Sequence, residues 1–310
     1  MSTQLKTPVA DDMTPEARRT YIGASDLPVI CGVSPFKSPF RLALEKRGEI
    51  ATDDLTGNPY VEAGNELEPF LRSWYARKSG LKINARHVTF IHSKYDFLRC
   101  HVDGNIVADK RGPGLFEAKT AGYWAGLSED WGEPETDEYP MPYHVQNQGA
   151  LAITRWTWGR LAALIGGNDF RPYPIEADES LQDAIVERAV KFWEAVQSGR
   201  LDDLDRTTAD VKSMFPHSVA AVVEASESVT DDVRISIELL EKKAAAEAEV
   251  RQFEKQLDPV RARVMHYMGT HDTLTIGGAP VITWKEQSRK GYTVEPTTFR
   301  VFRRVAAKGN

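Results

Sequence analysis

The spacing of hydrophobic and polar positions along the chain predicts alternating helices and strands. Helices are expected at Thr14–Ile22, from Leu27 onward, at Ser38–Lys46, Asn65–Ser79, Tyr143–Thr154 and Ser180–Ser198. The apolar face of the Asn65–Ser79 helix consists of Leu67, Phe70, Leu71 and Trp74. Strands rich in apolar and β-branched residues are expected at Arg86–His92, Phe97–Val107, Gly114–Lys119, Thr157–Ile165 and Arg171–Ile175. This order predicts an α/β core with crossover connections.

The pattern changes after Gly199. Residues 202–232 are acidic and irregular, and Val233–Tyr267 is a long helix rich in Ala, Glu, Lys, Arg and Leu. Pro259 should kink or split that helix, because proline lacks a backbone N–H. Ile276–Glu286 and Gly291–Val294 indicate a terminal hairpin. We therefore expect a flexible N-terminal lead over residues 1–15, a core over 16–200 and a C-terminal extension over 201–310.

Composition is that of an ordinary soluble protein, with 41% hydrophobic and 27% charged residues in a chain of 310. No run of about 18 apolar residues predicts a membrane span. The first residues, Met-Ser-Thr-Gln-Leu-Lys, lack the apolar segment of a signal peptide. Cys31 and Cys100 each have apolar neighbours, which indicates small buried side chains in a reducing compartment and no zinc site. These features predict a cytoplasmic protein.

The net charge of −6 argues against a broad basic surface that coats duplex DNA. It leaves room for an enclosed basic channel or a small cleft. Ser128–Tyr139 carries six acidic residues and no basic one, whereas Lys285–Asn310 carries seven Lys or Arg and two Glu. The basic C-terminal tail is the better candidate for contact with phosphate or an acidic partner, although such runs are usually solvated surface.

Candidate chemistry lies on two neighbouring strands. Asp103 belongs to the first strand, a turn over Asp109–Gly114 follows, and the second strand carries Glu117 and Lys119. Because side chains alternate faces along a strand, Glu117 and Lys119 project to the same side. Two carboxylates beside an ammonium suit a divalent-metal site for phosphodiester hydrolysis, with ordinary strand-edge charges as the alternative. A second E-x-K, Glu241-Lys-Lys243, lies in a charged helical stretch, where a solvated helix face explains it.

Several motifs occur in a fixed order. They are Ile22-Gly-Ala-Ser25-Asp with Gly32-Val-Ser-Pro35-Phe-Lys37, Gly64-Asn-Glu-Leu-Glu68-Pro, His101-Val-Asp103-Gly, Phe116-Glu117-Ala-Lys119-Thr, and Pro142-Tyr-His-Val-Gln146-Asn-Gln148 with Leu151-Ala-Ile-Thr154. Over about Arg18–Gly199 the chain resembles the YqaJ-like viral recombinase family, which includes phage lambda exonuclease. The resemblance implies a PD-(D/E)xK restriction-endonuclease-like core, a central mixed β-sheet flanked by helices, although Val102 stands where the fold's name has proline.

The resemblance also implies site residues. Asp103, Glu117, Glu68 and the backbone carbonyl of Ala118 would hold Mg²⁺, for which Mn²⁺ would substitute. Lys119 would be the catalytic lysine and Gln146 the active-site glutamine. Taken alone, Glu68 and Gln146 are typical of exposed helix positions.

A second implied site would bind the 5′-terminal phosphate. It contains Ser25 and Arg18, with Arg19 as the alternative one position away. A serine beside backbone N–H groups at a helix start is a good anion site. Without the resemblance, Ser25 is a helix N-cap.

The resemblance implies a Mg²⁺-dependent 5′→3′ exonuclease acting on double-stranded DNA ends, encoded by a phage or prophage. Its product would be a 3′ overhang for a single-strand annealing protein, and a homotrimeric ring would enclose the duplex. Such enclosure would reconcile the acidic net charge with DNA binding. The alternatives are an endonuclease or repair nuclease of the same fold, and a catalytically inactive DNA-binding or scaffold protein.

Overall fold

The computed structural model describes residues 9–10, 14–85, 88–123, 130–217 and 222–286. Two compact units divide the chain, Met1–Val211 and Lys212–Asn310. Most of the predicted lead, residues 1–15, lies outside the described residues. The predicted boundaries of the lead, core and extension stay predictions.

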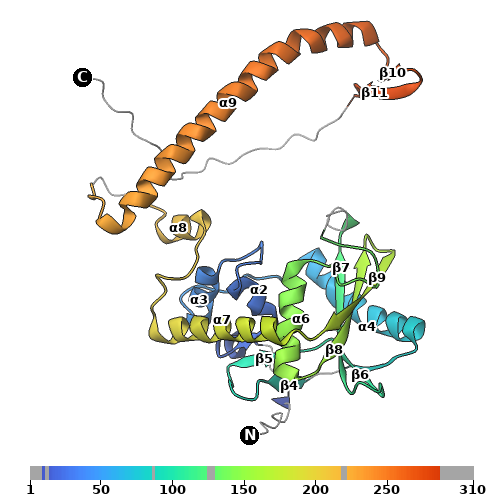
Figure 1. Cartoon of the computed structure of the whole chain (residues 1–310), viewed down its shortest axis with the longest axis vertical. Helices are drawn as coiled ribbons and strands as arrows, with labels where there is room; N and C mark the ends of the chain where they lie inside the picture. Colours follow the sequence, from blue (N-terminus) through green and yellow to red (C-terminus); the bar gives the residue numbers. More distant parts are fainter. Residues whose placement is uncertain (1–8, 11–13, 86–87, 124–129, 218–221, 287–310) are drawn as a thin grey trace. The chain divides into compact units, whose positions relative to one another are not determined.

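A five-stranded mixed sheet is the centre of the first unit (Figure 1). Its strands, in spatial order, are β3 (Lys82–Asn84), β6 (Gly104–Val107), β7 (Gly114–Ala121), β8 (Trp158–Ile165) and β9 (Asp169–Glu176). Within this sheet, β7 and β8 pair in parallel and the other neighbours pair antiparallel, and the connection between β7 and β8 contains α6 (Met141–Thr154). The expected α/β class, a central mixed sheet flanked by helices, is confirmed.

A smaller sheet corrects one predicted strand. Its order is β1 (Val9–Ala10), β4 (Val88–Ile91), β5 (Leu98–Cys100) and β2 (Ile22–Gly23). The expected single strand Phe97–Val107 is wrong, because it is two strands, β5 and β6, in two different sheets. Their partners differ: β5 pairs with β4 and β2, whereas β6 pairs with β3 and β7. A continuous apolar run cannot show where the chain changes sheets.

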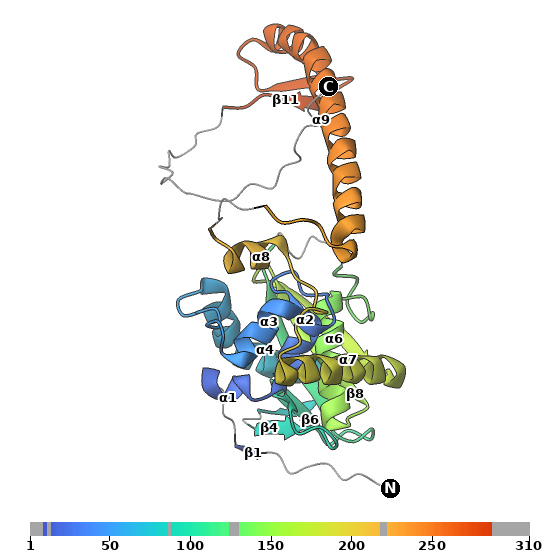
Figure 2. The ribbon, with the colours of Figure 1, turned by 90° about the vertical axis from the view of Figure 1, so that its left-hand side faces the viewer.

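Most helices of this unit begin and end at recognisable caps. They are α1 (Pro15–Arg19), η1 (Ala24–Asp26), α2 (Leu27–Ile30), α3 (Pro39–Arg47), α4 (Pro59–Ser79), α6 and α7 (Glu179–Ser198). The Ser38 hydroxyl caps α3 by accepting from the Arg41 N–H. Within Figures 1 and 2, α2, α3 and α7 lie side by side.

Helix α4 begins earlier than its periodicity predicts. The Asn58 side chain accepts from the Tyr60 N–H, and Pro59 takes the first helical position, where its missing N–H costs nothing. Leu71 and Tyr75 are the buried residues of this helix, whereas Phe70 is 47% exposed. The predicted apolar face was therefore wrong at Phe70, because the buried stripe is narrow and follows the i, i+4 pair Leu71 and Tyr75.

Two apolar clusters occupy the two faces of the large sheet. Leu115 of β7 joins the larger cluster, which includes residues of α2, α3, α6 and α7. Phe116 joins the smaller cluster together with Tyr75 of α4. Odd-numbered positions of β7 thus face α6, and even-numbered positions face α4.

The second unit contains the long helix α9 (Glu227–Met268) and the hairpin β10 (Thr273–Ile276) and β11 (Ala279–Thr283). Pro259 does not split α9, although the ribbon bends toward its C-terminal end (Figure 1). The hairpin turns at Gly277 and Gly278, which both have positive φ. Predicted strand Gly291–Val294 and the basic tail beyond residue 286 lie outside the described residues.

The prediction that residues 202–232 are irregular is wrong in part. This region contains α8 (Thr208–Met214) and the first residues of α9. Within the first unit, the Asp210 carboxylate accepts from the Ser38 hydroxyl at 2.8 Å, which holds the start of α8 beside the start of α3. Among the described residues, no helix combines the length and hydrophobicity that a bilayer span requires.

Candidate active site on strands β6 and β7

Strand pairing brings Asp103 to Glu117 and Lys119. Gly104 of β6 lies opposite Phe116 of β7 in the antiparallel register, so Asp103 enters the sheet beside the middle of β7. The Ala118 N–H donates to Asp103 Oδ2 over 2.8 Å. This bond fixes the Asp103 carboxylate against the β7 backbone.

Glu117 is the most enclosed carboxylate of the site, with 3% of its surface exposed. Its Oε1 accepts from Lys119 Nζ at 2.7 Å, as the alternation of side chains predicts. The same oxygen accepts from Gln146 Nε2 of α6 at 2.6 Å. Glu117 therefore has a cationic and a neutral donor at one oxygen.

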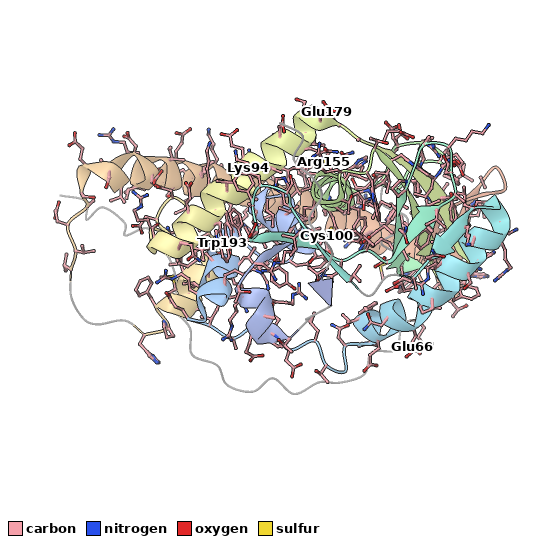
Figure 3. All side chains as sticks on the ribbon, turned by 90° about the horizontal axis from the view of Figure 1, so that it is seen from below. Glu66, Lys94, Cys100, Arg155, Glu179 and Trp193 are labelled. Atoms are coloured by element: carbon pink, nitrogen blue, oxygen red, sulfur yellow. The ribbon has the colours of Figure 1, made fainter. Side chains whose placement is uncertain are left out.

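Glu68 enters from α4 and is held by an arginine. Arg72 Nη1 donates to Glu68 Oε1 at 2.9 Å and to the backbone carbonyl of Asp103 at 2.6 Å. Glu66, two residues earlier on α4, lies instead at the exposed periphery of the unit (Figure 3). The structure thus distinguishes two glutamates that the sequence presents alike.

Two residues of this site were missed by the sequence prediction. Arg72 carries a usable signal, because it follows Glu68 by one helical turn, the spacing of an i, i+4 ion pair. Tyr143 of α6 has its ring centroid 5.3 Å from Lys119 Nζ, within cation–π range. Nothing in the local sequence distinguishes Tyr143 from other aromatic residues of the core.

Burial and neighbouring negative charges shift the pKa values of the acidic side chains in this site. Burial and then the negative charge of Asp103 raise the pKa of Glu117 to about 7, with a smaller contribution from Glu68. Burial likewise raises the pKa of Asp103, against the opposing charge of Lys119. Burial alone would lower the pKa of Lys119, but Glu117 and Asp103 outweigh it and raise that pKa.

The donor set fits a divalent cation. The negative charges of Asp103 and Glu68 act on the Glu117 carboxylate. A divalent cation such as Mg²⁺ or Mn²⁺, which binds hard carboxylate oxygens, would relieve this repulsion. Within the described part of the chain, no three acidic, histidine or cysteine side chains already stand as a ligand set. Glu68 is paired with Arg72, and Glu117 is paired with Lys119. A cation bound there would compete with these two basic side chains for the carboxylate oxygens.

The two residues predicted to bind a terminal phosphate contact each other. Arg18 Nη2 donates to the exposed Ser25 Oγ over 3.4 Å. The alternative, Arg19, is turned toward the end of α3, since a Cβ at Gly48 would lie 3.4 Å from its Nη1. The interpretation of Ser25 as the N-cap of α2 is wrong, because Ser25 lies inside η1 and the N-cap position belongs to Asp26, the other residue suited to it. Asp26 closes this turn instead, by accepting from the Gly23 N–H and pairing with Lys46.

Comparison with known proteins places these residues in one domain. Residues 15–157 match the model of the YqaJ-like viral recombinase domain. The protein YqaJ of Bacillus subtilis (strain 168), itself described as uncharacterized, is 32% identical over 195 residues. That match covers 62% of this chain and 58% of the relative, so it spans less than two thirds of the relative's length.

Similar solved structures include two exonucleases. An alkaline exonuclease from Laribacter hongkongensis is 19% identical, with a TM-score of 0.47 over 59% of this chain and 91% of that one. A phage-related exonuclease from Haemophilus somnus 129PT is 18% identical, with a TM-score of 0.39 over 58% of this chain and 96% of that one. Similarity at this level supports no conclusion, whereas the family match covers every site residue described above. Residues 15–157 match the YqaJ-like viral recombinase domain, and over this stretch the chain is similar to that family.

Proposed function

We propose that this protein is a Mg²⁺-dependent 5′→3′ exonuclease specific for double-stranded DNA ends. One observation carries the proposal: buried Glu117, beside Asp103, accepts from both Lys119 and Gln146. Burying two acids beside a lysine costs folding free energy, and acids with raised pKa values are typical of functional sites. The match to the YqaJ-like viral recombinase domain agrees with an enzyme that acts on DNA.

The site residues would divide the work. Asp103, Glu117, Glu68 and the Ala118 carbonyl would hold the cation, with Mn²⁺ able to replace Mg²⁺. A cation bound there supplies an activated water and neutralises charge that develops on the phosphate. Lys119, whose pKa is raised by Glu117 and Asp103, would orient the attacking water as a charged hydrogen-bond donor. Gln146, bonded to Glu117 Oε1, would keep that carboxylate in position.

The 5′→3′ direction of digestion would come from the predicted site for the 5′-terminal phosphate. Arg18 and the exposed Ser25 hydroxyl offer a charged donor and a neutral one to a 5′-terminal phosphate. Charge-assisted bonds from arginine to phosphate are short and strong. Holding that end would leave the first phosphodiester for hydrolysis and produce a 3′ overhang.

The protein would act as a ring-shaped homotrimer together with a single-strand annealing protein. A homotrimeric ring would keep the duplex enclosed, so that affinity need not come from a large basic face in a chain of net charge −6. The 3′ overhang would pass to a single-strand annealing protein during phage-type recombination in the bacterial cytoplasm.

The decisive experiment compares linear duplex with covalently closed circular duplex, each with and without Mg²⁺. An exonuclease degrades only the linear substrate, and a 5′ label is released before a 3′ label. Cleavage of the circle would instead support an endonuclease or repair nuclease of this fold. Binding without cleavage of either substrate would support an inactive DNA-binding or scaffold protein, and Asp103→Ala serves as the control for contaminating nuclease.

A further inference from the structure

An apolar stripe runs along the C-terminal half of α9. Val250, Phe253, Leu257 and Val260 are 54%, 59%, 47% and 46% exposed. Their spacing of three, four and three residues places them on one side of the helix. Val264 and Tyr267 continue the same spacing toward the end of the helix.

This spacing is that of a coiled-coil seam. Residues that alternate at intervals of three and four occupy the a and d positions of a heptad, which pack against another helix. Pro259 falls outside these positions, so the residue that interrupts the helical hydrogen bonds does not lie on the seam. Four large apolar side chains in a row on an exposed helix face favour a partner helix.

The charges beside the seam differ between its two ends. Glu247, Glu249 and Glu254 flank its N-terminal part, and Arg261 and Arg263 flank its C-terminal part. All five occupy the e and g positions, which set the orientation of paired helices, and all five are exposed. In a parallel pair of identical helices, acidic flanks would meet acidic flanks and basic would meet basic. In an antiparallel pair, Glu247 and Glu249 lie opposite Arg261 and Arg263 of the other copy, and Glu254 lies near the middle of the contact.

We propose that α9 pairs with the α9 of a second copy of this chain, antiparallel, through the seam Val250, Phe253, Leu257 and Val260. The seam is apolar throughout, and the charges at its two ends are complementary when one copy is reversed, which suits a two-fold contact between identical surfaces. This inference goes beyond the proposed function, since α9 carries none of the nuclease-site residues. If the first units form rings, α9 joins one ring to another.

Particle mass tests the pairing. Light scattering on the full chain should give an even number of chains per particle at micromolar concentration. Phe253→Glu/Leu257→Glu should halve that number, because it places charge in the seam. Lys255→Glu, a charge reversal on the outer face of the same helix, should leave it unchanged. An odd number of chains in the wild type, or an unchanged mass in the seam variant, would overturn the proposal.

Charge reversal tests the orientation. Arg261→Glu/Arg263→Glu alone should dissociate the pair, and so should Glu247→Lys/Glu249→Lys/Glu254→Lys alone. A chain with all five changes should pair again, because antiparallel complementarity is restored with the signs exchanged. Failure of the five-fold variant to regain the wild-type mass, with helix content unchanged by circular dichroism, would contradict the antiparallel arrangement.

Discussion

Arg72 holds Glu68 from one turn away on α4, with 2.9 Å between Nη1 and Oε1. The same nitrogen reaches the backbone carbonyl of Asp103 at 2.6 Å. A single guanidinium therefore ties a carboxylate on α4 to the segment that delivers Asp103 to the sheet. This link joins parts of the site that are 35 residues apart, because Glu68 lies on α4 and Asp103 comes immediately before β6.

We expect Arg72→Ala to lower stability by about 1–3 kcal/mol, because the Asp103 carbonyl loses its charged donor. Thermal unfolding in the absence of metal measures the change. Arg77→Ala, on the exposed side of the same helix, should have almost no effect. An Arg72→Ala variant as stable as the wild type would mean that β6 pairing and the Ala118 N–H bond are enough to hold the Asp103 segment.

Asp103→Ala and Glu117→Gln should each reduce hydrolysis by about a hundredfold or more, because each removes a carboxylate from the proposed cation site. Glu117→Gln should also keep or raise the unfolding temperature at pH 8 without metal, since the folded protein favours the neutral form of Glu117. Glu66→Gln, on the exposed part of α4, is the control. Activity within tenfold of the wild type would reject the assignment of these acids.

Lys119→Ala should lower kcat while DNA binding persists, because the proposed cation ligands remain. The appropriate control is Lys243→Ala, which removes the lysine of the other E-x-K sequence, on the exposed surface of α9. Single-turnover kinetics and fluorescence anisotropy separate the two quantities. Weaker DNA binding with an unchanged kcat would identify Lys119 as a phosphate contact.

Arg18→Ala and Ser25→Ala should reduce the preference for 5′-phosphorylated over 5′-hydroxyl ends. A hydrogen bond to a charged group contributes about 1.5–3 kcal/mol, which corresponds to roughly 10- to 150-fold in the ratio of rates. Arg19→Ala should reduce both rates alike, if it changes them at all. The same loss on both substrates in the Arg18 variant would assign Arg18 to general DNA binding or to folding.

The pKa of Glu117, raised by burial to about 7 from an ordinary value of 4.5, makes cation binding depend on pH. The folded protein holds this proton more tightly than the unfolded chain, so this group's contribution to metal-free stability falls as pH rises from about 4.5 to about 7. Cation binding needs the ionised carboxylate, so Mg²⁺ affinity should rise over the same range.

Calorimetry in two buffers with different ionisation enthalpies measures the protons released on Mg²⁺ binding. Release should be clear at pH 6 and nearly absent at pH 8.5. Glu117→Gln removes the titrating group and should abolish most of the release. An affinity independent of pH in the wild type would show that Glu117 is already ionised in the metal-free protein.

The sequence by itself determined the local features. Strand periodicity places Glu117 and Lys119 on one side of β7, where the structure has them in contact at 2.7 Å. The helix expected over Ser38–Lys46 and the α/β order of elements were likewise predicted from the types and spacing of neighbouring residues. These predictions held because side-chain direction repeats with the backbone.

Only the tertiary structure decided which distant residues meet. Strand pairing split the apolar run Phe97–Val107 between two sheets and delivered Asp103 to β7. Packing of α6 brought Gln146 to Glu117, 29 residues away in the chain. Periodicity reports the face of an element, but not the element it will contact, because that choice depends on how all the apolar faces are buried together.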